Sequence, residues 1–300
     1  YRLLSFDELW KKSGFDESEH MFSVRTRSAD EEYGNGVHQW YCGMQDAGGV
    51  LQKGPWVGNR FHWYCLFDNE DYRITKGVKH RFQYDSQVKN GRGYYYPGTP
   101  EYKLMATGKN MDDVKVQEPV APFNDGLTYT NSISSNCLAF TTKYADVTDP
   151  TIGRTDAYWP FLRYADIVLI YAEAQCELND GISQDAIDAL NDIRIRSNAK
   201  EASVTGDGAI ETKVELRSVI FEERAKELAY EGDRRWDLLR WGIYLDVMNS
   251  LGGINEDGTR TPYDEGSINK RREFRHLLYP LPSLEVSTNM AIDKNNPGWN

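Results

Sequence analysis

Residues 160–241 constrain the fold most strongly, because their apolar side chains recur at the spacing of amphipathic helices. The first stripe advances in alternating steps of three and four residues, through Leu162, Ala165, Leu169, Ala172 and Cys176. That spacing places these side chains on one side of a helix. Pro160 stands just ahead of the stripe, where its missing backbone N–H leaves no hydrogen bond unmade. We therefore expect a helix that follows directly on Pro160.

Two more helices are predicted after the first. Residues 179–181 interrupt the first stripe, and Ser183 can cap the helix that follows. The second stripe consists of Ala186, Leu190 and Ile193. A short connection between two amphipathic helices predicts an antiparallel pair. A third helix is expected from Thr212 to Glu231, with Gly232 as its stop.

The two helices before and after residue 181 can be compared with a tetratricopeptide hairpin, in which small residues stand about 12 positions apart. Ala174 and Ala186 have this separation, but the aromatic positions of that repeat are missing. The residues alone therefore favour a plain helical hairpin over a repeat. Under either interpretation we expect four side chains to be buried in helix contacts: Ala172, Ala174, Leu190 and Leu228.

Several sequence blocks in the last half of the chain resemble one known family. They are FLRYADI at 161–167 with YAEA at 171–174, ER at 223–224 with EL at 227–228, GDRRWDL at 232–238 with RWG at 240–242, and YPLP at 279–282 with NNPG at 295–298. In composition and order these blocks resemble the signature segments of the SusD/RagB family. Lys143 and Tyr144, followed by Asp146, resemble the lead into the family's helical block.

The resemblance implies a mostly α protein with tetratricopeptide-like helical hairpins, an α–α superhelix, long loops and small β-hairpins. It implies one SusD-like domain over residues 1–300, with a loop-rich, ligand-facing insert at 35–159 and a helical-repeat core at 160–242. Family members also carry a signal peptide, a lipid-accepting cysteine and further helical repeats, none of which stands at the start of this sequence. We therefore expect the chain to be the C-terminal part of a longer protein.

The resemblance also implies a function. Such proteins capture an oligosaccharide or polysaccharide without cleaving it and deliver it to a SusC-like TonB-dependent transporter for nutrient uptake. They work at the extracellular face of the outer membrane, held there by a lipid anchor. Two alternatives stay open: a peptide- or protein-binding scaffold of the same family without sugar affinity, and a glycoside hydrolase.

Charge, hydropathy and cysteine usage exclude several classes of partner. The formal net charge of −11 argues against nucleic acid and against an anionic membrane surface. No run of 18 apolar residues occurs, so the sequence predicts no membrane span. Cys176 lies on the first helical stripe and is expected to be buried. The sequence does not decide whether Cys42 and Cys65 form a disulfide.

The segment 35–59 is the predicted ligand site, because it combines glycines with aromatic and amide side chains and shows no helical or strand period. Such a segment is typical of a surface loop. Sugars offer flat C–H faces to aromatic rings and hydroxyl groups to amides and carboxylates. We expect Trp40, Tyr41 and Trp56 to form the platform, with Asn35, Gln39 and Asp46 as hydrogen-bonding groups. The next candidates are Tyr94, Tyr95 and Tyr96 in a predicted hairpin or loop tip.

No motif of a catalytic or cofactor site occurs. The five histidines are scattered, and the sequence lacks HExxH, GxSxG, a Walker A loop and GxGxxG. Forty-six acidic residues allow many carboxylate pairs, so no glycosidase pair can be identified among them. We therefore expect neither catalysis nor a cofactor, and leave open a structural Ca²⁺ site made of scattered carboxylates and carbonyls.

Two charged segments are expected to be structural. Asp71 and Arg73 are interpreted as an ion pair. The segment 232–242 carries arginines and tryptophans, which indicates either a patch for an anionic ligand or packing. We favour packing, with the tryptophans between hairpins and Arg234, Arg235 and Arg240 paired with acids such as Glu223, Glu227 and Asp237. Residues 21–24 alternate and suit a short strand.

Overall fold

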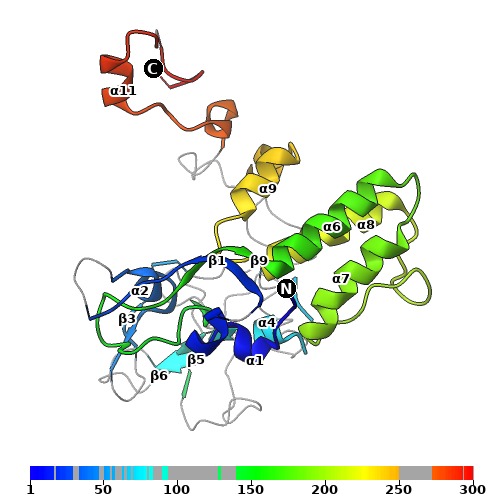
Figure 1. The fold of residues 1–300 in the computed structure, drawn as a ribbon, viewed down its shortest axis with the longest axis horizontal. Coiled ribbons are helices and arrows are strands. Elements are labelled where there is room, and N and C mark those ends of the chain that lie inside the picture. The colour runs from blue at the N-terminus through cyan, green and yellow to red at the C-terminus, as the bar shows by residue number, and fades with distance from the viewer. Residues whose placement is uncertain are drawn as a thin grey trace. The chain divides into compact units, whose positions relative to one another are not determined.

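The computed structural model describes residues 1–16, 18–29, 34–46, 51–54, 56–57, 63, 66–68, 70–79, 81–83, 90–93, 128–129, 140–249, 272–292 and 294–299, and for 16, 81–83, 90–93 and 128–129 it describes the backbone alone. The chain divides into two compact units, Tyr1–Gly232 and Asp233–Asn300. Figure 1 shows the elements of both.

Three helices form the centre of the first unit: α6 (Tyr164–Leu178), α7 (Gln184–Arg196) and α8 (Lys213–Glu227). Figure 1 shows them gathered into one bundle. Ser183 caps α7 by accepting a hydrogen bond from the Ala186 N–H, as predicted. Thr212 and Glu215 form a capping box at the start of α8. The side chain of each residue accepts a hydrogen bond from the backbone N–H of the other. Local sequence therefore fixes both helix starts.

The core of this bundle is apolar and continuous. Its fully or almost fully buried members include Ala165, Leu169, Ala172, Cys176, Ala186, Leu190, Ile193, Leu216 and Ile220. The predicted burial of Ala172, Leu190, Leu228 and Cys176 is confirmed. The predicted burial of Ala174 is wrong, because that side chain is exposed on the opposite side of α6. The separation of Ala174 from Ala186 therefore does not mark a contact between the two helices.

A two-stranded ribbon leads into the bundle. β1 (His20–Val24) pairs antiparallel with β9 (Trp159–Arg163), and β9 runs directly into α6. The strand expected at 21–24 is confirmed. The helix expected to follow directly on Pro160 begins instead at Tyr164, because Pro160 lies opposite Ser23 within the ribbon. A partner strand distant in sequence thus overrides the local helical spacing of Leu162.

Short elements make up the rest of the first unit. The helices are α1 (Phe6–Leu9), α2 (Val37–Cys42) and α4 (Tyr72–Thr75), with a 3-10 helix at Lys12–Asp16. The strands pair as β2 (Met44–Gln45) with β3 (Leu51–Lys53), β4 (Val78–Lys79) with β8 (Phe140–Thr141), and β5 (Arg81–Gln83) with β6 (Asn90–Gly93), which also pairs in parallel with β7 (Thr128–Tyr129). The described residues are thus mostly helical, with small sheets.

Buried ion pairs join the short elements to the bundle. Arg163, at the end of β9, contacts Glu19, Glu227 and Glu231 at N–O distances of 2.6, 3.0 and 2.7 Å. Lys143 donates to Glu231 at 2.6 Å. Desolvation by burial would raise the pKa of Glu231, but the neighbouring charges of Arg163 and Lys143 outweigh it and lower that pKa.

The same network continues toward α4. Arg73 forms a bidentate pair with Asp71, from Nε to Oδ1 and from Nη2 to Oδ2, and a further pair with Glu223, which also accepts from Arg194 at 2.8 Å. The ion pair predicted for Asp71 and Arg73 is confirmed. Inside the first unit, Glu223 pairs with Arg73 and Arg194, and Glu227 pairs with Arg163 and Arg196.

The second unit contains α9 (Arg234–Arg240), α10 (Tyr244–Asn249), a 3-10 helix at Phe274–Leu277 and α11 (Ser283–Thr288). Arg240 pairs with Asp237 at 2.9 Å, as predicted. Arg235 donates to the Tyr244 hydroxyl and, at 2.8 Å, to the His276 carbonyl. Trp236, expected to pack between hairpins, is exposed.

Candidate functional site

The candidate ligand segment is more ordered than its sequence indicates. Residues 37–42, expected to be loop, form α2, and residues 44–45 and 51–53 form the β2–β3 ribbon. A six-residue helix offers too short a pattern for periodicity to be recognised. Its position is set by distant residues, since Asn35 exchanges backbone hydrogen bonds with Thr155 at 3.1 and 2.8 Å.

The side chain of Asn35 anchors the start of α2. Its Oδ1 accepts from the Val37 N–H at 2.8 Å, and its Nδ2 donates to Thr26 Oγ1 at 2.8 Å and to the Ala157 carbonyl at 2.7 Å. These contacts use its amide oxygen and both amide protons within the protein. Asn35 therefore holds the start of α2 in place.

Two tryptophans of the predicted platform are exposed on neighbouring backbone segments. Trp40 is 45 % exposed and Trp56 is 73 % exposed. The Val57 N–H donates to the Trp40 carbonyl at 2.9 Å, which brings the residue after Trp56 against the end of α2. The ring of Trp40 lies over Gly36, where an added Cβ would stand 3.1 Å from the indole. Gly36 thus leaves room for the Trp40 ring, a role that the sequence pattern did not indicate.

Tyr41 points in a different direction from Trp40. Its ring lies 5.4 Å from Tyr144, 6.0 Å from Trp159 and 5.5 Å from Tyr230, measured between ring centroids. These rings belong to a second apolar cluster that includes the buried Val37, Cys42 and Phe140. Burial raises the pKa of the Tyr41 hydroxyl. The structure therefore places Tyr41 among packed aromatic rings.

The remaining polar candidates lie around the same segment. Gln39 is half-buried and its Oε1 lies close to Gly153, where an added Cβ would be only 2.8 Å away. Asp46 follows β2, and its Oδ2 accepts from Gln52 Nε2 at 3.2 Å. Tyr94, Tyr95 and Tyr96 lie outside the described residues.

The two buried titratable residues of α2, His38 and Cys42, are engaged within the protein. Burial lowers the pKa of His38, whose Nδ1 lies 2.9 Å from the Tyr144 carbonyl. Burial raises the pKa of the Cys42 thiol to about 12, and its Sγ donates to the Thr141 carbonyl at 3.1 Å. A thiol with so high a pKa is a poor nucleophile at neutral pH. Cys42 is a free thiol, so it forms no disulfide with Cys65 here.

Neither a metal cluster nor a membrane span is found in the part of the chain that the structure describes. There, no three His, Cys, Asp or Glu side chains converge as the ligands of a metal ion would. No described helix combines the length and apolar character needed to cross a bilayer.

The sequence and the fold were compared with known proteins. The model of the SusD family matches residues 47–299. SusD-like protein P2 of Formosa agariphila is 33 % identical over 142 residues, which cover 46 % of this chain and 25 % of that protein. SusD-like protein P38 of the same organism is 36 % identical over 142 residues, covering 45 % and 25 %. The matches thus span about a quarter of the curated relatives' length.

Solved structures share the fold over a longer range. A SusD superfamily protein from Parabacteroides distasonis matches with a TM-score of 0.61 at 18 % identity, covering 100 % of this chain and 54 % of that one. Surface glycan-binding protein A from Bacteroides thetaiotaomicron, solved in complex with laminarihexaose, matches with a TM-score of 0.57 at 19 % identity, covering 99 % and 56 %. The chain spans about half the length of these structures. The expected fold class, mostly α with tetratricopeptide-like hairpins, is confirmed.

Proposed function

The chain belongs to the SusD family, and from that premise we propose that it binds an oligosaccharide or polysaccharide without cleaving it. The observation that carries the proposal is the pair of exposed indoles, Trp40 and Trp56, joined through the hydrogen bond from Val57 to the Trp40 carbonyl. Large exposed aromatic side chains on two segments joined in this way favour contact with a partner. A structural neighbour that binds laminarihexaose supports a glycan as that partner.

In the proposed mechanism the two indoles stack on the C–H faces of sugar rings. Gln39 and Asp46 supply hydrogen bonds to the hydroxyl groups at the rim, and Asn35 holds the start of α2 in place. Tyr41 supports the site from below through its contacts with Tyr144 and Trp159. Each stacked ring adds about 0.5–1.5 kcal/mol beyond area burial, so a few contacts give micromolar to millimolar affinity, which suits capture followed by release.

The decisive experiment measures binding across a panel of soluble polysaccharides by affinity electrophoresis and calorimetry. The double variant Trp40→Ala/Trp56→Ala is expected to lose binding while keeping the wild-type unfolding midpoint. Trp236→Ala removes another exposed tryptophan, on α9, and serves as the matched control that keeps binding. Normal binding by the double variant would move the platform elsewhere, with Tyr94, Tyr95 and Tyr96 as the next candidates.

The proposal separates capture from catalysis. His38 and Cys42, the titratable groups beneath the platform, are buried and engaged with backbone carbonyls. We therefore expect no reducing ends to be released from a bound polysaccharide above a heat-inactivated control. Release above that control would favour a glycoside hydrolase.

Delivery of the glycan to a SusC-like TonB-dependent transporter, and a lipid-anchored position on the extracellular face of the outer membrane, belong to this proposal through the family. The second candidate is a peptide- or protein-binding scaffold. A protein that binds no polysaccharide in the panel but binds peptides through Trp40 and Trp56 would favour that candidate.

A further inference from the structure

Two consecutive side chains of α2, those of Gln39 and Trp40, each rest against a glycine. The ring of Trp40 lies over Gly36, where a Cβ would stand 3.1 Å from the indole Nε1. The amide of Gln39 lies over Gly153, where a Cβ would stand 2.8 Å from Oε1. Non-bonded carbon atoms pack at about 3.5–4.0 Å, so a side chain at either glycine would displace the group that rests there.

The backbone conformation does not require glycine at either position. Gly36 has a φ of −93°, which other residues also adopt, and the φ of Gly153 lies outside the left-handed region. Gly14 and Gly77 differ from this pair, because a Cβ at either would meet a backbone oxygen. At Gly36 and Gly153 the missing Cβ makes room for a side chain instead, and in both cases that side chain belongs to the candidate ligand site.

Both glycines lie beside one backbone bridge. Asn35 and Thr155 exchange hydrogen bonds at 3.1 and 2.8 Å. Gly36 directly follows Asn35, and Gly153 precedes Thr155 by two residues. Side chains on a helix lean toward its N-terminus, which takes those of Gln39 and Trp40 back toward this bridge. An aromatic ring and an amide are therefore held at the same end of α2.

The amide of Gln39 is available to a ligand. Within the described part of the chain its side chain makes no hydrogen bond, although it is half-buried and touches Gly153. The amide of Asn35, by contrast, is used within the protein, and Asp46 accepts from Gln52. An amide that is held in place with its donors and acceptor unused is suited to recognising a polar group of a ligand.

We propose that Gly36 and Gly153 are positioning residues of the glycan site, which hold the Trp40 ring and the Gln39 amide in the arrangement that one sugar ring requires. The indole stacks on the C–H face of that sugar, and the amide bonds a hydroxyl group on its rim. This inference rests on the proposed function and adds the residues that orient the bound sugar. Groups that are already in place lose less freedom on binding, which favours affinity.

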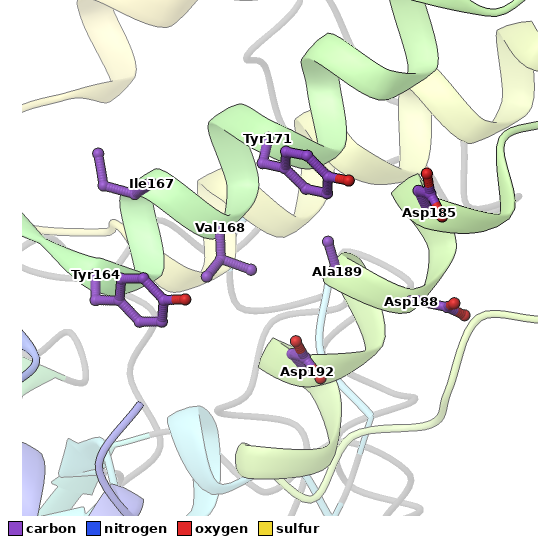
Figure 2. A pocket seen from close by; sticks show the side chains of 8 residues that line it. All are labelled: Tyr164, Ile167, Val168, Tyr171, Asp185, Asp188, Ala189 and Asp192. Atoms are coloured by element: carbon purple, nitrogen blue, oxygen red, sulfur yellow. The ribbon is translucent and has the colours of Figure 1, made fainter. Parts of the chain in front are cut away.

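The pocket between α6 and α7 offers a comparison. Figure 2 shows this pocket, of about 480 Å³, with Tyr171 on the α6 wall and Asp188 on the α7 wall. Neither helix contains a glycine, so its aromatic rings have no glycine on these helices to rest against. Tyr171 is 47 % exposed and provides the control aromatic residue for the experiment.

The test adds a Cβ at each of the two positions and measures binding by calorimetry, using the whole chain and whichever of laminarin, starch, xylan and galactomannan binds it most tightly. Gly36→Ser is used because serine suits the start of a helix, and Gly153→Ala is its counterpart. Each is expected to weaken binding about two- to tenfold, the loss of one stacked ring or one hydrogen bond.

Gly181 provides the matched controls, because a Cβ there would meet no atom within 4 Å. Gly181→Ser and Gly181→Ala are expected to keep the wild-type affinity, as is Tyr171→Ala. The unfolding midpoints of Gly36→Ser and Gly153→Ala should match those of the controls, because the displaced groups are side-chain ends that can move toward solvent.

Double variants separate a positioning role from a structural one. If Gly36 acts through the ring of Trp40, Gly36→Ser has no further effect on affinity once Trp40→Ala has removed that ring. Likewise, Gly153→Ala has no further effect once Gln39→Ala has removed the amide. A loss caused by general damage to the fold would persist in both double variants.

The α protons of Gly36 report the position of the ring without any glycan. A nearby indole shifts their NMR resonances, so the wild type and Trp40→Ala are expected to differ at Gly36, whereas Gly153→Ala should resemble the wild type. Resonances of Gly36 that Trp40→Ala leaves unchanged would overturn the proposal, because the ring would not then rest there.

The binding results distinguish this inference from the proposed function. Unchanged affinity in Gly36→Ser and Gly153→Ala, with binding lost in Trp40→Ala/Trp56→Ala, would overturn the inference and leave the proposed function standing. Unchanged affinity in Trp40→Ala/Trp56→Ala would overturn both. Affinity lost in Tyr171→Ala at an unchanged unfolding midpoint would move the sugar to the pocket in Figure 2 and would also overturn the inference.

Discussion

Arg163 and Glu231, 68 residues apart, form a buried ion pair in which Arg163 Nε donates to Glu231 Oε2 at 2.7 Å. The side chain of Arg163 is 0 % exposed and that of Glu231 is 4 % exposed. The pair fastens the end of the β1–β9 ribbon to the segment that follows α8. Burial removes the hydration of both charged groups, and their mutual attraction offsets that desolvation cost.

Removing the cation is expected to destabilise the fold strongly. Arg163→Met leaves Glu19, Glu227 and Glu231 buried without their shared partner, and we expect the free energy of unfolding to fall by about 3–5 kcal/mol. Urea denaturation measures the change. Arg217→Met breaks an exposed pair with Glu177 and is the matched control, expected to lose less than about 1 kcal/mol. An equal fall in the free energy of unfolding in both variants would contradict the conclusion that burial makes the Arg163 pairs the more important ones.

Shortening a core side chain of α7 is expected to leave a cavity. Leu190 is fully buried in the bundle, so Leu190→Ala should lower the free energy of unfolding by about 2–5 kcal/mol. Ile195→Ala, at an exposed position of the same helix, should change it by less than about 0.5 kcal/mol. Comparable urea midpoints for both variants would argue against the observed packing of α7.

Asp156 is expected to make part of the stability pH-dependent. Partial burial would raise its pKa, but hydrogen bonds from Lys12 and Thr148 outweigh burial and lower the pKa from 3.8 to about 2. A carboxyl whose pKa is lower in the folded state stabilises the fold above pH 4, and this contribution is lost as pH falls toward 2. Asp156→Asn should therefore be less stable than wild type at pH 6, with the difference shrinking between pH 4 and 2. A difference that is constant with pH in urea titrations would show that ionisation of Asp156 is not involved.

Arg235 is expected to stabilise the second unit without affecting glycan binding. Its guanidinium donates to Tyr244 and to the His276 carbonyl, and it lies 4.6 Å from the centre of the Tyr279 ring. Arg235→Ala removes hydrogen bonds from a charged donor, worth about 1.5–3 kcal/mol each, and should lower the melting temperature. Affinity for polysaccharide should match wild type in the folded fraction. Lost affinity at unchanged melting temperature would reassign the segment to ligand binding.

Local sequence predicts the starts of α7 and α8 well because their caps lie within a few residues, whereas α8 ends at Glu227 and not at the expected Glu231. Ser183 and Thr212 begin their helices through contacts to the very next turn. Pro160 shows the limit of this approach, since its strand conformation depends on pairing with Ser23, far away along the chain. The same limit applies to Glu223, whose partner Arg73 is 150 residues away.

The candidate site was harder to predict because the type of a residue does not show which way its side chain points. Trp40 and Tyr41 are adjacent in sequence, yet one ring is exposed and the other packs against Tyr144. Successive residues of a helix point about 100° apart, so a short helix separates neighbours that a loop would leave together. Recognising α2 requires the contacts of Asn35 with Thr155, which no local pattern contains.

The buried ion pairs also bear on the order of folding events. Those of Arg163 join it to acids 64 to 144 positions away, whereas α6, α7 and α8 contact one another along a continuous stretch. Long loops close more slowly and at greater entropic cost than short ones, so the bundle is expected to form before Glu19 and Arg163 meet. In stopped-flow experiments Arg163→Met should then accelerate unfolding and leave the folding rate almost unchanged. The charged interior of this chain would thus set the lifetime of the native state, and the apolar helices the speed at which it is reached.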